Sequence, residues 1–181
     1  MFIAVGIILF VFVVYCFLVY NKAIQLRNYV REAFATMDVY LKKRWDLVPN
    51  LVETVKSYAN YEKSTFEKIT KLRNKNYDSM TDLEKMQSGS QLAVMIPSII
   101  ALAENYPDLK ASQNFIKLMD DLANIEDDIA NSRKYYNGSV RVYNTFLEVF
   151  PSNILCKFWG FSTCKLFEIA NVEKNNVKIE L

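Results

Sequence analysis

The stretch FIAVGIILFVFVVYCFLVY, at positions 2–20, decides the fold class of this chain. Its 19 residues carry no charged side chain. As an α-helix they would extend roughly 28 Å, close to the ~30 Å hydrocarbon core of a bilayer. The stretch therefore predicts one N-terminal membrane-spanning helix. The residues assigned to this membrane anchor include Phe2, Ile7, Phe10, Phe12, Tyr15, Phe17 and Tyr20.

A cleaved secretory signal is the alternative interpretation of the same stretch. Only the α-amine supplies positive charge before it, and no small-x-small cleavage site lies at its end, so an uncleaved anchor is favoured. Lys22, Arg27 and Arg31 follow the stretch, with Glu32 as the only nearby acid. By the positive-inside rule, this bias predicts that residues 21–181 of a single-pass protein lie in the cytoplasm.

Helical periodicity continues beyond the apolar stretch, and no Gly or Pro interrupts residues 7–48. This pattern predicts a continuous helix to about Trp45, roughly 65 Å long. Asp46 could cap a second helix that runs to about Asn74, with Pro49 in its first turn. A kink at this point is the alternative to a break. The apolar positions that recur at helical spacing are Ile24, Val30, Phe34, Met37, Leu41, Val48, Leu51, Val52 and Val55.

Two further long helices are predicted in the second half of the chain. Thr81 and Glu84 have the spacing of a capping box, which marks the start of one helix after a polar turn. Gly89 and Pro97 weaken that helix and predict a kink or a late start. Pro151 should end the other, which Gly138 interrupts, and a short helix should follow at about 153–161. The longest apolar stripe steps by three and four through Phe115, Leu118, Leu122, Ile125, Ile129, Ser132, Tyr136, Val140, Tyr143 and Leu147.

These segments predict an all-α fold, in which an N-terminal transmembrane helix continues into a long-helix antiparallel bundle of the four-helix type. The scarcity of turn residues, with 4 Gly and 4 Pro in 181 residues, argues against an all-β fold. The predicted division is a membrane anchor at 1–20, a helical bundle domain at 21–168 and a polar C-terminal tail at 169–181. Only residues 177–180 show strand-like alternation.

Charge is distributed unevenly along the chain, although the net charge is only +2. Residues 21–76 hold 12 basic and 6 acidic side chains, whereas residues 77–150 hold 6 and 11. Opposite charges on the two halves could attract within the bundle or between copies, or could be two solvated helix faces. The chain lacks the concentrated basic face that nucleic acid would require, so nucleic acid is not an expected partner.

The densest charges give a candidate interaction surface. Its basic part could instead be the solvated side of a tightly packed helix, and its acidic part could be a solvated face. The predicted surface comprises Lys42, Lys43 and Arg44 on one side and Asp120, Asp121, Asp127 and Asp128 on the other.

No enzyme chemistry is suggested by the residue types. The chain has no histidine, which removes Ser/His and Cys/His nucleophile pairs and the commonest metal ligand. We therefore expect no catalytic residue, no metal and no cofactor. Cys16 lies in the apolar stretch. A disulfide between Cys156 and Cys164 is an alternative if the domain faces outward. Four aromatic residues of the tail could close the bundle core or dip into a bilayer interface: Phe158, Trp159, Phe161 and Phe167.

Several uninterrupted blocks form a recognisable set: Tyr20-Asn21, Leu26–Asn28, Glu32–Val39, Leu41–Arg44, Asp46–Lys56, Ala103–Ser112, Tyr136-Asn137, Tyr143-Asn144 and Phe150–Asn153. Together they resemble the LemA family of bacterial membrane proteins. The resemblance covers about residues 20–168 and is weakest around 76–92. It implies an N-terminal membrane helix with a helical bundle, a bacterial cell membrane location and no accepted catalytic residues; a magnetosome-associated relative is linked to membrane compartment formation.

Two functions are compatible with these observations. In the first, the chain is a non-enzymatic, single-pass membrane protein that self-assembles through its bundle as a membrane-associated scaffold and could shape the bilayer. In the second, it is a monomeric envelope adaptor that binds a membrane protease or another envelope protein. Both need the lipid bilayer, and the first also predicts a homo-oligomer.

Overall fold

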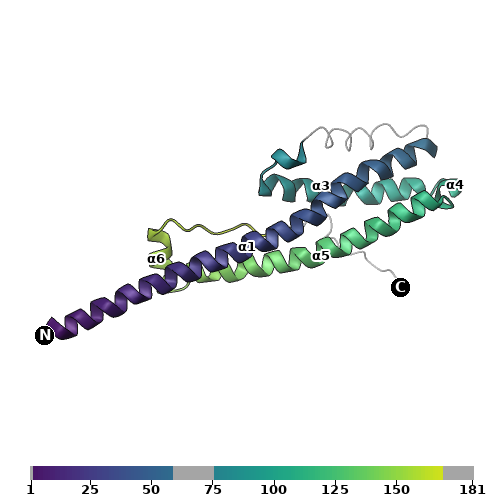
Figure 1. The fold of residues 1–181 in the computed structure, drawn as a ribbon. Coiled ribbons are helices and arrows are strands. Elements are labelled where there is room, and N and C mark those ends of the chain that lie inside the picture. The colour runs from purple at the N-terminus through teal and green to yellow at the C-terminus, as the bar shows by residue number, and fades with distance from the viewer. Residues whose placement is uncertain (1, 59–75, 169–181) are drawn as a thin grey trace, which may run out of the picture. The chain divides into compact units, whose positions relative to one another are not determined.

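The computed structural model describes residues 2–58 and 76–168, and within these ranges the chain forms helices and no strand. The predicted all-α fold, with an apolar N-terminal helix followed by further long helices, is confirmed (Figure 1). The predicted helix end near residue 74, the strand-like residues 177–180 and the tail at 169–181 lie outside the described residues. The elements are α1 (Phe2–Tyr58), the 3-10 helix η1 (Tyr77–Ser79), α3 (Asp82–Ala103), α4 (Pro107–Lys110), α5 (Gln113–Glu148) and α6 (Ser152–Phe158).

Helix α1 is longer than the sequence predicted. A break near Asp46 was expected, but the helix continues through Pro49 to Tyr58. A proline inside a helix removes one backbone hydrogen bond and costs roughly 3 kcal/mol or more. The apolar stripe compensates because Val48, Leu51 and Val55 are all fully buried on the same side of α1. Core packing therefore outweighs the local preference for a break.

The capping box at the start of α3 is confirmed. The Thr81 hydroxyl accepts a hydrogen bond from the Glu84 backbone N–H, and the Glu84 carboxylate accepts one from the Thr81 N–H. The helix begins directly at Asp82, so the late start that Gly89 suggested does not occur. Pro97 lies within α3, between the buried residues Ile96 and Ile99.

Helix α5 also runs through a residue expected to interrupt it. Gly138 lies inside its 36 residues, and the helix ends at Glu148 rather than at Pro151. The predicted stripe is buried except at Leu118 and Ile125, which are half-buried. The short helix α6 ends at Phe158, earlier than predicted, and Gly160 turns the chain with a φ of 75°.

The chain divides into two compact units. Unit 1 contains residues 1–35 and 132–167, and unit 2 contains residues 36–131 and 168–181. The predicted bundle domain at 21–168 is thus shared between two units, each of which takes part of α1 and part of α5. In unit 1 these two helices run antiparallel, with the rings of Phe34 and Tyr136 in edge contact at 5.8 Å.

Unit 2 packs α3 closely against α1. Asp38 of α1 pairs with Lys85 of α3, and further along both helices Arg44 contacts Gly89, so the two helices run parallel. Gly89 permits this approach, because a Cβ there would lie 2.9 Å from a Leu41 methyl and 3.2 Å from Arg44 Nη2. Leu41 is buried and has little freedom to move.

Two glycine substitutions should therefore change stability in opposite directions. Gly138→Ala meets no atom within 4 Å and should raise the free energy of unfolding by about 0.5–1 kcal/mol through helix propensity. Gly89→Ala should lower it, because an overpacking cost of about 1–3 kcal/mol exceeds the same gain. Urea unfolding of the detergent-solubilised protein, followed by circular dichroism, measures both. Equal stabilisation by the two variants would contradict the close packing at Gly89.

Candidate functional site

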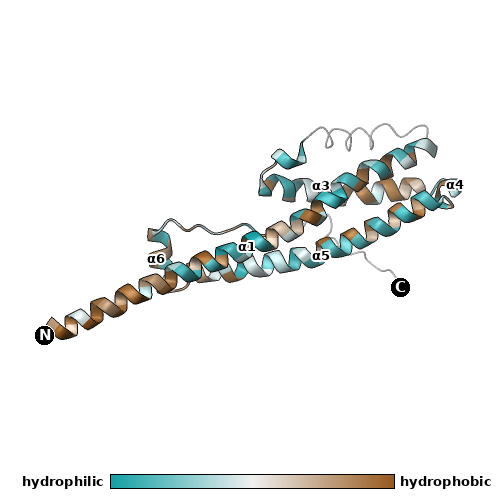
Figure 2. Cartoon of the chain, in the orientation of Figure 1, coloured by the Kyte–Doolittle hydropathy of each residue, from teal (hydrophilic) through white to brown (hydrophobic). Residues whose placement is uncertain are grey.

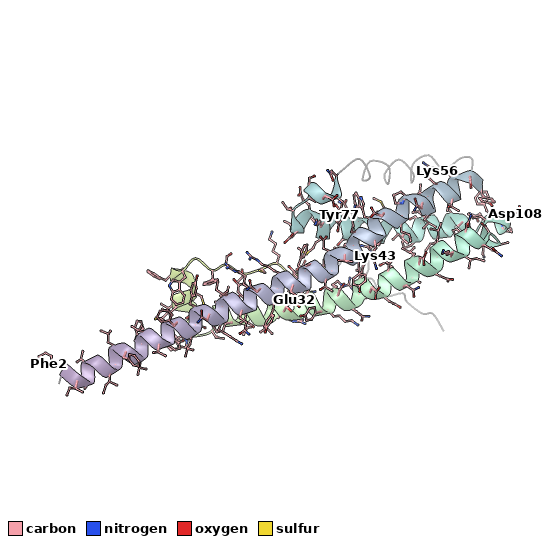
Figure 3. All side chains as sticks on the ribbon, viewed as in Figure 1. Phe2, Glu32, Lys43, Lys56, Tyr77 and Asp108 are labelled. Carbon is pink, nitrogen blue, oxygen red and sulfur yellow. The ribbon has the colours of Figure 1, made fainter. Side chains whose placement is uncertain are left out.

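The N-terminal part of α1 presents its apolar side chains outward. Phe2 is 87% and Phe10 is 69% exposed, and Figure 3 shows no other element beside Phe2. Ile7, Phe12 and Phe17 are also exposed, whereas Tyr15 is half-buried. The hydrophobic colouring of Figure 2 runs from the N-terminus to the level of α6. By length and composition this segment can cross a membrane.

Helix α3 also satisfies the length and composition criteria for a membrane span. Its apolar side chains are instead used in the interior of unit 2, where Leu92, Ile96 and Ile99 are buried. Its backbone carbonyl at Gly89 accepts a hydrogen bond from a charged guanidinium. These contacts are those of a core helix.

An aromatic cluster surrounds the end of the apolar segment in unit 1. The ring of Tyr20 makes edge contacts with Trp159 at 5.3 Å and with Phe161 at 5.8 Å. The Arg27 guanidinium lies over the Phe161 ring at 5.4 Å from its centroid, in cation–π geometry. Tyr and Trp are the side chains that favour the membrane–water interface.

A short segment without regular secondary structure, residues 164–167, is hydrogen-bonded to α5 by side chains of a repeated Tyr-Asn pair. Asn144 donates to the Cys164 carbonyl and accepts from its N–H, and Asn137 makes the same two bonds with Phe167. The Tyr136 hydroxyl donates to the Lys165 carbonyl. The seven-residue spacing puts both asparagines on one face of α5. This arrangement holds Trp159 and Phe161 against α1.

The four tail aromatics differ in burial, and only one of them closes the core. Phe167 is buried, and the Arg133 guanidinium lies 5.9 Å from its ring centroid, so Phe167 closes the core. Trp159 and Phe161 are half-buried at the aromatic cluster. Phe158 is exposed and contributes nothing to the core.

The three cysteines are free thiols. The alternative of a disulfide between Cys156 and Cys164 is therefore not formed. Burial raises the pKa of the Cys156 thiol. Burial also raises the pKa of the Cys164 thiol, although Arg31 and Arg27 partly oppose the shift. Both shifts favour the unreactive protonated form over the nucleophilic thiolate.

Arg44 does not belong to the exposed basic cluster in which the sequence placed it. The side chain is 2% exposed, and its Nη1 donates to both carboxylate oxygens of Glu126 at 2.9 Å. Nη2 donates to the Gly89 carbonyl at 2.6 Å. One guanidinium thus joins α1, α3 and α5 inside unit 2. Arg44 is correspondingly withdrawn from any surface that a partner could reach.

The two neighbouring lysines stay at the surface of unit 2. Lys42 forms an ion pair with Asp46 at 3.2 Å and lies 5.2 Å from the centroid of the Tyr77 ring. Lys43 is exposed beside the Tyr40 ring. Of the predicted basic cluster, Lys43 is the side chain most available to another molecule.

Tyr77 anchors η1 to α1 through a part-buried polar cluster. Its hydroxyl donates to Asp38 at 2.7 Å, and Lys85 forms an ion pair with the same carboxylate at 2.6 Å. Burial, together with the hydrogen bond and charge of Asp38, raises the pKa of Tyr77 far above its usual value. The phenol therefore keeps its proton and remains a donor. The Trp45 ring packs beside it at 5.4 Å.

The predicted acidic residues of α5 form one face. At about 100° per residue, their positions fall within a sector of about 120°. Asp120, Asp121 and Asp127 are exposed and Asp128 is half-buried. None of the four forms an ion pair with a described residue, whereas Glu126 points inward to Arg44. We call Asp120, Asp121, Asp127 and Asp128 the acidic face.

The described residues 2–58 and 76–168 contain no group of three carboxylates or thiols placed to hold a metal ion. The available arrangement is thus a membrane-compatible helix with an aromatic cluster at its end, and a charged surface on unit 2. The hydrogen bonds of Asn137 and Asn144 to residues 164–167 were not predicted from the sequence. The Tyr-Asn pair that repeats after seven residues was a signal that could have indicated them. The inward role of Arg44 was not predicted either, because a charge run gives no signal for it.

The Arg44–Glu126 contact should dominate the stability of unit 2. Arg44→Lys keeps the charge but loses the fork that reaches two partners. Breaking a buried ion pair costs about 3–5 kcal/mol, and the partial exposure of Glu126 should reduce this loss to about 2–3 kcal/mol. A double-mutant cycle with Glu126→Gln, measured by urea unfolding, should give a coupling energy of about 1–2 kcal/mol.

Lys43→Gln is the matched control for this cycle, because Lys43 is the adjacent exposed cation. It should change the free energy of unfolding by less than about 0.5 kcal/mol. An Arg44→Lys variant as stable as this control would contradict the structural role assigned to Arg44.

Comparison with known proteins identifies the family. A sequence model described as the LemA family matches residues 33–181. The Protein LemA of Metamycoplasma hominis is 24% identical over 160 residues, which cover 87% of this chain and 72% of the relative. The family match spans most of the chain and begins after the apolar segment of α1. The chain belongs to the LemA family.

Proposed function

We propose that this protein is a non-enzymatic, membrane-anchored scaffold that assembles with copies of itself. Family membership and the apolar start of α1 fit a bacterial membrane protein. The observation that carries the further step is the opposite charge of the two units. Unit 1 contains 8 basic and 2 acidic side chains, net +6, and unit 2 contains 14 and 18, net −4.

Charge complementarity of this kind favours contacts between copies. The acidic face of α5 forms no ion pair with the described residues of its own chain. The ion pairs within the chain use other acids, among them Glu126, Asp38 and Asp46. Exposed bases on a neighbouring copy, including Lys43, Lys134 and Arg141, can meet the acidic face. Such surface attraction acts over a Debye length of about 8 Å at physiological salt and weakens as salt rises.

The direction of the anchor follows from the same charges. The bases after the apolar segment, Lys22, Arg27 and Arg31, all belong to unit 1. Under the positive-inside rule they favour a cytoplasmic location for the residues that follow the span. In this proposal the scaffold forms on the cytoplasmic side of a bacterial cell membrane, where its assembly could shape the bilayer.

Reversing the acidic face should dissolve the assembly without unfolding the protein. The test variant carries Asp120→Lys, Asp121→Lys and Asp127→Lys. The matched control carries Glu104→Lys, Asp108→Lys and Glu148→Lys, three exposed acids outside the face. Light scattering of each protein in mild detergent, corrected for bound detergent, gives the mass at low and high salt.

The scaffold predicts a wild-type oligomer that becomes smaller as salt rises, a test variant reduced to monomers and a control that behaves as wild type. Circular dichroism should show equal helix content in all three. A wild-type monomer at both salt concentrations would contradict self-assembly. Equal disruption by the control would contradict the role of the acidic face.

The alternative function is a monomeric envelope adaptor for a membrane protease or another envelope protein. The same acidic face would then meet a basic surface on that partner. Recovery of one stoichiometric partner with wild-type protein but not with the acidic-face variant, combined with a monomeric mass, would support the adaptor over the scaffold.

A further inference from the structure

Three large apolar side chains at the end of unit 1 are exposed. Phe150 is 79%, Ile154 is 62% and Phe158 is 82% exposed. Ile154 and Phe158 lie one turn apart on α6, so they share a face, and Phe150 lies two residues before the helix begins. Isolated apolar residues are common on protein surfaces, but a cluster of this kind marks a contact site.

The position of this cluster relative to the membrane span is set by the aromatic contacts. Trp159 follows α6 directly, and its ring lies 5.3 Å from that of Tyr20, the last residue of the apolar segment. Phe161 contacts the same Tyr20 ring. Figures 1 and 2 show α6 beside α1 where the hydrophobic colouring ends. Helix α6 therefore lies beside the end of the apolar segment of α1.

A hollow in the surface next to α6 is lined by polar as well as apolar side chains. Oδ1 of Asn153 is buried and has no hydrogen-bond partner among the described residues. Lys157 lines the same hollow and is exposed, so a cation is available there. The apolar residues that line the hollow are Leu147, Ile154, Phe158 and Phe161.

We propose that α6 is a second membrane contact, lying in the headgroup region of the leaflet from which α1 emerges. Phe150, Ile154 and Phe158 insert between acyl chains, while Lys157 meets the phosphates of anionic phospholipids. An apolar face flanked by a lysine fits the pattern of interfacial helices. The net charge of +6 on unit 1 attracts the same anionic surface.

This second contact would restrict how unit 1 tilts on the membrane. A single spanning helix leaves its attached domain free to rotate and tilt about one point, whereas two contacts at one level define an orientation. The inference rests on the anchoring of α1, as in the proposed function, but does not depend on self-assembly.

Tryptophan quenching by brominated phospholipid tests the inference directly. In a Trp45→Phe and Trp159→Phe background, one tryptophan is introduced as Phe158→Trp, as Phe10→Trp in the span or as Tyr135→Trp on exposed α5. Each full-length protein is placed at one copy per nanodisc of brominated phosphatidylcholine and phosphatidylglycerol. Phe158→Trp and Phe10→Trp should both be quenched several-fold more than Tyr135→Trp.

Each outcome decides a separate point. If Phe158→Trp is quenched no more than Tyr135→Trp while Phe10→Trp is quenched, the α6 contact is wrong and the anchor stands. If Phe10→Trp is not quenched, the anchor fails and the inference fails with it. Adding Lys157→Glu to Phe158→Trp should lower its quenching, and unchanged quenching would contradict the role of anionic headgroups.

Discussion

Unit 2 depends on the hydrogen bonds and the ion pair of one buried guanidinium, that of Arg44. This group binds the Glu126 carboxylate and the Gly89 carbonyl at once, so one side chain of α1 fixes the positions of α3 and α5. A buried cation is costly unless its donors are paired. Nη1 and Nη2 are paired across the three helices, whereas the buried Nε has no hydrogen-bond partner among the described residues. Gly89 is needed at the same point because a side chain there would occupy the space of Leu41 and Arg44.

The same ion pair inside unit 2 determines which carboxylates remain exposed at its surface. Glu126 is used inside the unit, whereas its neighbours on the acidic face point outward. Unit 1 is stabilised by different contacts. They are made by aromatic rings and side-chain amides near the end of the apolar segment of α1. The Asn137 and Asn144 side chains imitate backbone partners for residues 164–167 and so place Trp159 beside Tyr20. Unit 1 thus places aromatic contacts at the end of the apolar segment, and unit 2 presents charge.

Much of the fold could be predicted from the sequence because helix periodicity and capping are local signals. The Thr81 capping box and the buried stripe of α5 are examples. The break expected near Asp46 was wrong because tertiary packing of Val48, Leu51 and Val55 overrides the effect of Pro49. Arg44 was misplaced because a run of three bases does not reveal which one faces inward. That direction depends on Glu126, which lies 82 residues further along the chain.

Self-assembly of the anchored protein in a membrane can be counted by single-molecule photobleaching. Each copy carries one fluorophore, and the full-length protein is diluted into supported bilayers that contain phosphatidylglycerol. A scaffold should give spots that bleach in several steps at low salt and in fewer steps as salt is raised. Spots that bleach in a single step at every salt concentration would show that the anchored protein is a monomer and would contradict the scaffold.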